Sequence, residues 1–113
     1  MNTIEHLQKW YQSQCDGDWE HAWGVKVDTL DNPGWKVEID LVGTALAGRA
    51  FSPLKRLGDE SEWIRCEVRG DKFLGDGGPL MLEEIIRTFL RWAESMSTRT
   101  NPRTFTRPRD ELQ

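Results

Sequence analysis

Residues 15–24 place several kinds of reactive side chain in one short stretch, CDGDWEHAWG. Alternating carboxylates followed by a histidine are potential metal ligands, and a carboxylate beside a histidine is a potential general base and acid. A cysteine near a histidine suggests a thiol nucleophile. Carboxylates beside tryptophans instead suggest a docking surface for a protein. The side chains concerned belong to Cys15, Asp16, Asp18, Trp19, Glu20, His21 and Trp23.

A metal site is poorly supported by the spacing of these residues. A calcium loop of the EF-hand type needs a twelve-residue array that ends in a bidentate glutamate, and the sequence from Asp16 lacks one. The two cysteines, Cys15 and Cys66, show none of the spacings typical of zinc sites. The glycine-rich GDGGP at 75–79 lacks the lysine of a phosphate-binding loop. We therefore predict no metal and no cofactor.

Catalysis is also weakly supported, although it stays open as an alternative. Glu20 and His21 are adjacent in a region that we predict as extended, where neighbouring side chains point to opposite faces. Acidic residues after Cys15 disfavour the thiolate that a nucleophile requires. We therefore predict that the chain is not an enzyme. A small enzyme centred on Glu20 and His21 is the alternative, and the simplest structural interpretation is that Asp16 and Asp18 end a helix.

The charge is unevenly distributed along the 113 residues, a length that fits one domain. The net charge is −4, but the segment 98–113 has four arginines against two carboxylates, so residues 1–97 carry −6. We predict one domain over 1–97 and a basic, disordered tail over 98–113. An acidic body argues against direct binding of nucleic acid and favours a basic protein partner.

The segment MNTIEHLQKW lacks the apolar region of a signal peptide, and no apolar run has the length of a membrane span. We expect a cytoplasmic protein with two free thiols and no membrane association. The oligomeric state is open between a monomer and a weak dimer.

Hydrophobic periodicity predicts a helix followed by a hairpin. The helix begins after Asn2, with Glu5 placed for a capping box, and ends near residues 14–16. Residues 23–30 and 35–41 alternate as strands. The simplest interpretation of Trp19 and Trp23 is that both fill the core. Pro33 and Gly34 between the strands predict a type II turn over residues 32–35.

The second half predicts two more strands and a helix. An edge strand is expected over 49–57 because it contains Pro53, and Asp59-Glu60-Ser61 is a turn. A strand with Ile64, Cys66 and Val68 inward follows, and 71–79 reads as a loop. Pro79 opens an amphipathic helix. The predicted fold is α+β: an N-terminal helix, a four-stranded antiparallel meander and a C-terminal helix, with both helices on one face of the sheet.

The runs LQKWYQSQCDGDWEHAWGVKVDTLDNPGW, VEIDLVGTAL and LEEIIRTFLRWAE resemble the bacterial immunity protein 53 family of polymorphic toxin systems. The similarity covers about residues 4 to 95 and is most specific in the stretch WYQSQCDGDWEH and in the hairpin TLDNPGW. Alanine before Trp23 is a conservative departure from the family pattern. The resemblance implies an inhibitor that binds and blocks the toxic domain of a cognate secreted toxin.

The interface is predicted from charge and aromatic content within the most specific stretches. It comprises Asp16, Asp18, Trp19, Glu20, Asp31, Asn32 and Trp35. Many such toxins act on nucleic acid, so a basic toxin domain, such as a nuclease, is the expected partner. Two alternatives stay open: inhibition through the exposed sheet face, including Lys36, Glu38, Asp40, Arg65 and Glu67, and a protein-interaction domain unrelated to toxins.

Overall fold

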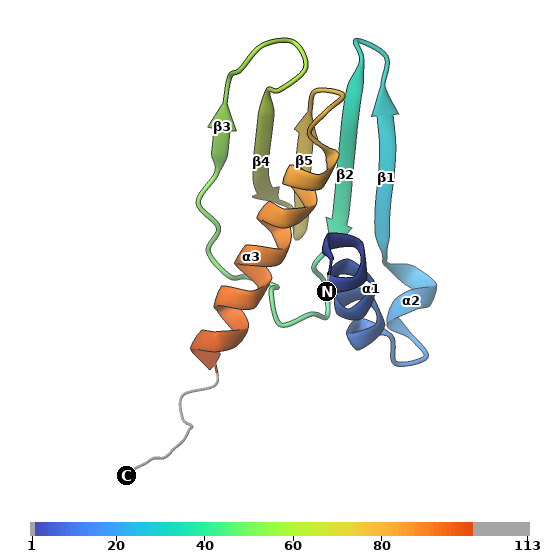
Figure 1. Cartoon of the computed structure of the whole chain (residues 1–113). Coiled ribbons are helices and arrows are strands. Elements are labelled where there is room, and N and C mark those ends of the chain that lie inside the picture. The colour runs from blue at the N-terminus through green and yellow to red at the C-terminus, as the bar shows by residue number, and fades with distance from the viewer. Residues whose placement is uncertain (1, 101–113) are drawn as a thin grey trace.

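Three helices and five strands make up the computed structural model, which describes residues 2–100 (Figure 1). Nothing is described of residues 101–113, so the predicted tail lies almost entirely outside the described residues. Among the described residues, no helix has the length and hydrophobicity needed to cross a membrane. The elements in chain order are α1 Thr3–Gln14, α2 Trp19–Ala22, β1 Val25–Leu30, β2 Gly34–Asp40, β3 Leu54–Arg56, β4 Ile64–Arg69, β5 Lys72–Gly77 and α3 Leu82–Thr100.

The strands form one antiparallel sheet in the order β1-β2-β5-β4-β3. Figure 1 shows α1 and α3 in front of the same face of this sheet. The α+β class and the placement of both helices are therefore confirmed, as is the edge position of the strand that follows Pro53. The order differs from the predicted four-stranded meander, because a fifth strand, β5, lies between β2 and β4.

The prediction of a loop over 71–79 is wrong, because residues 72–77 form the central strand. The misleading signal was the glycine content of this segment. An added Cβ at Gly75 would overlap Cγ2 of Ile85, and one at Gly77 would lie 2.9 Å from the Trp63 carbonyl oxygen and 3.0 Å from Cβ of Met81. These glycines let α3 lie directly on the strand backbone, which is a recognised use of glycine within strands.

The start of the last helix and the turn of the first hairpin differ from the predictions. The helix α3 begins at Leu82 rather than at Pro79. The Asn32–Pro33 peptide is cis. Gly34 is the first residue of β2, and its φ is not positive as a type II turn would require, so the predicted type II turn is wrong. Glycine is required at position 34 because a Cβ there would overlap the carbonyl oxygen of Gly77 on the neighbouring strand.

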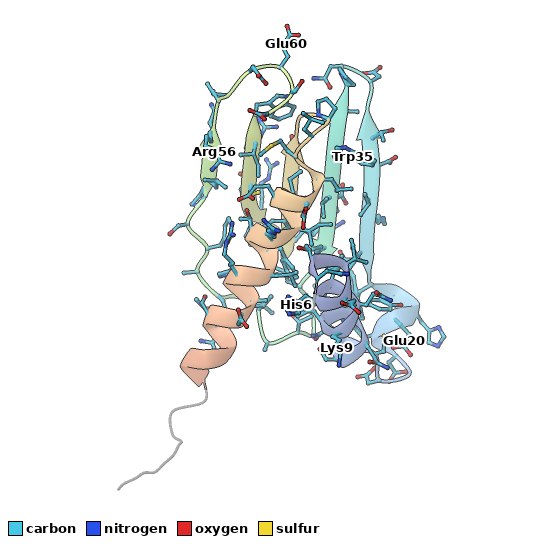
Figure 2. The ribbon with its side chains drawn as sticks, viewed as in Figure 1. His6, Lys9, Glu20, Trp35, Arg56 and Glu60 are labelled. Atoms are coloured by element: carbon cyan, nitrogen blue, oxygen red, sulfur yellow. The ribbon has the colours of Figure 1, made fainter. Side chains whose placement is uncertain are left out.

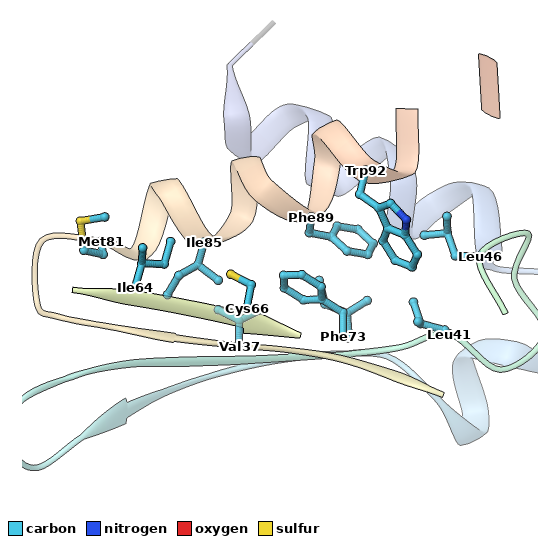
Figure 3. Close-up of a cluster of buried hydrophobic side chains, with 11 residues drawn as sticks. Val37, Leu41, Leu46, Ile64, Cys66, Phe73, Met81, Ile85, Phe89 and Trp92 are labelled. Atoms are coloured by element: carbon cyan, nitrogen blue, oxygen red, sulfur yellow. The ribbon is translucent and has the colours of Figure 1, made fainter. Parts of the chain in front are cut away.

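The core lies between the sheet and the two long helices (Figure 3). Its centre is aromatic: the rings of Phe73 and Phe89 are 5.2 Å apart, and Trp10 meets Phe89 edge-on at 4.8 Å. Such pairs add stability beyond the area that they bury. The predicted inward strand residues Ile64 and Cys66 and the helix residues Ile85, Ile86 and Phe89 are all buried. The predicted capping box is present, with Asn2 and Glu5 bonded reciprocally at 2.9 and 3.0 Å.

Replacement of Gly75 by alanine is predicted to destabilise the fold by about 1–3 kcal/mol, because the added methyl group overfills the contact between β5 and α3. Gly24→Ala is the matched control, since a Cβ at Gly24 meets nothing within 4 Å. Urea unfolding of both variants measures the difference. Equal losses of stability would contradict the packing role assigned to Gly75.

Candidate functional site

The acidic stretch forms a compact junction between α1 and β1 rather than the start of a strand. The chain turns at Gly17, whose φ is +96°, and then forms the single helical turn α2, Trp19–Ala22. This turn was not predicted, and β1 begins only at Val25. The junction lies at one end of the β1–β2 hairpin, where Figure 2 shows Glu20.

Two of the three carboxylates of the junction are engaged with its backbone. The Asp16 carboxylate accepts hydrogen bonds from the N–H groups of Asp18 and Trp19, both at 2.9 Å. The Glu20 carboxylate reaches back to the N–H groups of Asp16 at 3.0 Å and Gly17 at 2.8 Å. Backbone hydrogen bonds, that from Trp19 foremost, lower the pKa of Asp16, and backbone hydrogen bonds also lower that of Glu20. These two side chains stabilise the fold of the junction.

Asp18 differs from its two acidic neighbours. It is exposed, and its carboxylate makes no hydrogen bond or ion pair with another residue of the described part. The charge of Asp18 is therefore the one in this junction that is directed at solvent without an internal role. It is the carboxylate of the three that is best placed to meet a partner.

The two tryptophans of the stretch have opposite environments. Trp19 is 6% exposed, and its indole N–H donates to the carbonyl of Val42 at 2.7 Å. It was predicted both as a core residue and as a partner-binding residue, and its burial favours the first. Trp23 was expected in the core but is 40% exposed, so that expectation is wrong. Because it precedes β1, the sequence periodicity had suggested a buried strand position that does not exist.

The strand alternation that counted against a catalytic pair of Glu20 and His21 was an incorrect premise. Both residues lie in α2, so strand alternation does not separate them. Even so, both oxygens of Glu20 are occupied by backbone N–H groups, and its lowered pKa makes it a weaker base. His21 is exposed at the end of the turn. This arrangement holds a turn together and does not resemble a general acid–base pair.

The cysteines and the acidic residues offer little further chemistry. The Cys66 thiol is buried beneath α3, and burial raises its pKa to about 12, which suppresses the thiolate. The Cys15 thiol donates to the carbonyl of Tyr11 at 3.3 Å. No group of three or more His, Cys, Asp or Glu side chains that could hold a metal ion occurs in the described part of the chain.

The remaining predicted interface residues lie at the other end of the hairpin. Asp31 and Asn32 are exposed in the turn between β1 and β2, and Trp35 is half-buried with its indole N–H bonded to the carbonyl of Pro79 at 3.0 Å. In Figure 2, Trp35 and Glu20 are at opposite ends of the hairpin. The structure therefore separates the predicted residues into two groups, and strand β1 runs between them.

A groove beside β1 was not predicted from the sequence. A groove of about 360 Å³ runs between α1 and the start of β1 and is lined by Ile4, Leu7, Gln8, Tyr11, Gly24 and Val25. Ile4 is 55% exposed, Tyr11 40% and, further along the same strand, Val27 46%. The helical spacing of Ile4 and Tyr11 predicts that both lie on one side of the first helix, but spacing alone does not show that this side is left exposed.

The outer face of the sheet is a network of ion pairs. Lys36 and Glu38 are 3.0 Å apart, and Lys72 contacts Glu38 at 3.6 Å and Asp40 at 3.7 Å. Pairs at 2.6 Å and 3.2 Å join Arg65 to Asp76 and Arg69 to Glu67. Contact with Glu38 raises the pKa of Lys36 and contact with Lys36 lowers that of Glu38. The charges on the outer face of the sheet neutralise one another, so this face, the alternative binding surface, attracts a charged partner only weakly.

Removal of the Asp16 carboxylate is predicted to cost more stability than removal of the Asp18 carboxylate. Asp16→Ala leaves two N–H groups without their acceptor, whereas Asp18→Ala removes no internal contact. Because the folded-state pKa of Asp16 is lowered, its contribution is complete above its unfolded pKa and is lost as the pH falls through the lower folded value. Urea unfolding at pH 7 and below about pH 4 measures both effects. Similar unfolding midpoints for the two variants at pH 7 would contradict this assignment.

Comparison with known proteins gives one match. The family model described as immunity protein 53 matches residues 4–94, which is most of the chain and includes the junction, the groove and all five strands. No curated protein and no solved structure matches the chain. On the extent of this match, the chain belongs to the immunity protein 53 family.

Proposed function

We propose that this chain is a bacterial immunity protein that binds the toxic domain of a cognate secreted toxin and blocks it by direct contact. The observation that carries the proposal is the family match over residues 4–94. Immunity proteins act as inhibitors rather than enzymes, and the engaged state of Glu20 is consistent with that role. In this proposal the chain acts in the cytoplasm as part of a polymorphic toxin system.

The charge of the domain supports a basic partner. Residues 1–97 carry −6, and exposed carboxylates without an internal role occur at Asp18 and in the hairpin turn at Asp31. A toxin that acts on nucleic acid needs a basic surface to bind phosphate groups. An acidic inhibitor is attracted to that surface, which raises the rate of association to as much as about 10⁸–10⁹ M⁻¹s⁻¹ at low salt. A nuclease domain is therefore the partner that this charge fits best.

The proposed interface keeps some of the predicted residues and replaces others. Asp18, Asp31 and Asn32 are exposed and stay in it, while Trp19 leaves it because that side chain is buried. Trp23, five residues after Asp18, takes its place as an exposed aromatic anchor. Asp16 and Glu20 contribute mainly by holding Asp18 in position.

Co-expression tests the proposal. The toxin domain encoded by the gene beside the one for this chain is expressed from an inducible promoter in a bacterial host, with and without this chain. We expect growth arrest with the toxin alone and restored growth with both. The purified chain is also expected to form a complex with a catalytically inactivated toxin domain. Continued arrest in the presence of a soluble chain would refute the immunity function.

Asp18→Lys is predicted to slow association with the toxin by about three- to tenfold at low salt, because it reverses a charge that attracts a basic partner. Glu60→Lys is the matched control: Glu60 is also exposed, but it lies in the loop between β3 and β4, at the edge of the sheet away from β1 (Figure 2). Stopped-flow or surface plasmon resonance at low and high salt measures both rates. The difference should shrink at about 0.5 M salt through screening. Equal rates for Asp18→Lys and wild type at low salt would exclude Asp18 from the attraction.

A further inference from the structure

The free edge of strand β1 is the feature that links the two separated groups of predicted interface residues. β1 pairs with β2 on one side only, through an uninterrupted register from Val25↔Ile39 to Leu30↔Gly34. Figure 1 shows no described element beside its other edge. The strand has six residues, so this open edge is about 20 Å long.

The hydrogen-bond pattern identifies which backbone groups are available at this edge. The Asp40 N–H donates to the Gly24 carbonyl at 3.0 Å, which makes this a hydrogen-bonded pair just before β1. Since such pairs alternate in an antiparallel ladder, Val25, Val27 and Thr29 direct their N–H and C=O groups away from β2. Three acceptors and three donors therefore face the free edge, and one of these donors, the Thr29 N–H, is bonded to the Asp28 carboxylate at 3.1 Å.

The other edge of the sheet is protected, and the contrast is informative. Strand β3 has three residues, is preceded by Pro53, and carries Lys55 and Arg56. Short length, proline and basic side chains are the usual means of preventing an edge from pairing with another chain. β1 has none of these apart from Lys26, and its register contains no bulge. It is an edge left competent for pairing.

The surroundings of β1 also indicate the chemistry of a partner. The face that continues onto the groove is apolar: Val25 lines the groove with Ile4 and Tyr11, and the exposed Val27 lies on the same face of β1 as Val25. The charges around the edge are mostly negative. Asp18 lies beyond one end of the strand and Asp31 beyond the other, with Asp28 on the strand itself. An extended segment with apolar residues on one face and basic residues on the other would complement both features.

We propose that an extended, basic segment of the cognate toxin domain adds to β1 as a sixth strand and places apolar side chains in the groove beside α1. This inference rests on the proposed immunity function and specifies the surface through which that function operates. Pairing of main chains would supply affinity, while the groove and the acidic ends would select the sequence of the added strand. The two groups of predicted residues would then contact the two ends of one bound strand.

The test uses proline at an edge-facing position. Val27→Pro removes one outward N–H without removing a hydrogen bond to β2, so the fold should persist. The Kd for the inactivated toxin domain should rise by about 10- to 100-fold, because a toxin carbonyl loses its donor within the interface. Lys55→Pro is the matched control. The β3–β4 register and the bond from Gly78 N–H to the Trp63 carbonyl place the Lys55 N–H on the opposite free edge.

The outcomes separate this inference from the function on which it rests. Strand addition is supported if Val27→Pro binds the toxin domain more weakly and Lys55→Pro binds it as the wild type does, both variants having native circular dichroism. Wild-type affinity of Val27→Pro, or an equal loss in Lys55→Pro, overturns it while the immunity function stands. Failure of the wild-type chain to bind the toxin or to protect cells overturns both.

A second measurement applies if Val27→Pro does not fold. Hydrogen–deuterium exchange of the wild-type chain should show slowed exchange at Val25, Val27 and Thr29 when the toxin domain is added, and unchanged exchange there overturns the inference. Sedimentation of the chain alone tests whether a second copy of the chain, rather than the toxin, pairs with this edge. A dimer in which the same three amides are protected, and which does not dissociate when toxin binds, would assign the edge to a second copy and overturn the proposal.

Discussion

The direct packing of α3 on the backbone of β5 is the contact on which the remaining architecture depends. Side chains are absent at Gly75 and Gly77, so Ile85 and Met81 approach the central strand closely. That approach brings Phe89 against Phe73 and closes the aromatic core. It also determines the order of the sheet, because the strand buried under the helix occupies the middle. β1 and β3 are consequently the two edges, and β1 is the one without protection.

The carboxylates of this acidic domain perform different tasks. The carboxylates of Asp16 and Glu20 accept hydrogen bonds from the backbone of the turn between α1 and β1. The carboxylates on the outer face of the sheet form salt bridges with lysine and arginine. Among the described residues, exposed carboxylates without a salt bridge include those of Asp18, of Asp31 in the hairpin turn, and of Glu60 and Glu62 in the loop between β3 and β4. The net charge alone does not identify which part of the surface meets a basic partner. The internal contacts remove the paired carboxylates from consideration, and the open edge of β1 with its neighbouring groove favours Asp18 and Asp31 over Glu60 and Glu62.

Much of the fold could be predicted from local signals, and the failures have physical causes. The capped first helix, the alternating strands and the apolar stripe of the last helix are all encoded within a few residues of one another, and each was predicted. Glycine in β5 was misread because its purpose is a contact with Ile85, which is close in space and is not visible as a periodicity. Of the site, the exposure of Asp18 followed from its type, whereas the burial of Trp19 and the exposure of Trp23 depended on an unpredicted helical turn.

A structure of the complex between this chain and the toxin domain encoded beside it is the decisive test of strand addition at β1, because it requires that binding occurs and shows where. We predict one toxin domain per chain, with an extended toxin segment hydrogen-bonded to Val25, Val27 and Thr29 and basic side chains near Asp18 and Asp31. A toxin domain seated on the ion-paired outer face of the sheet, with the β1 edge left open to solvent, would contradict it.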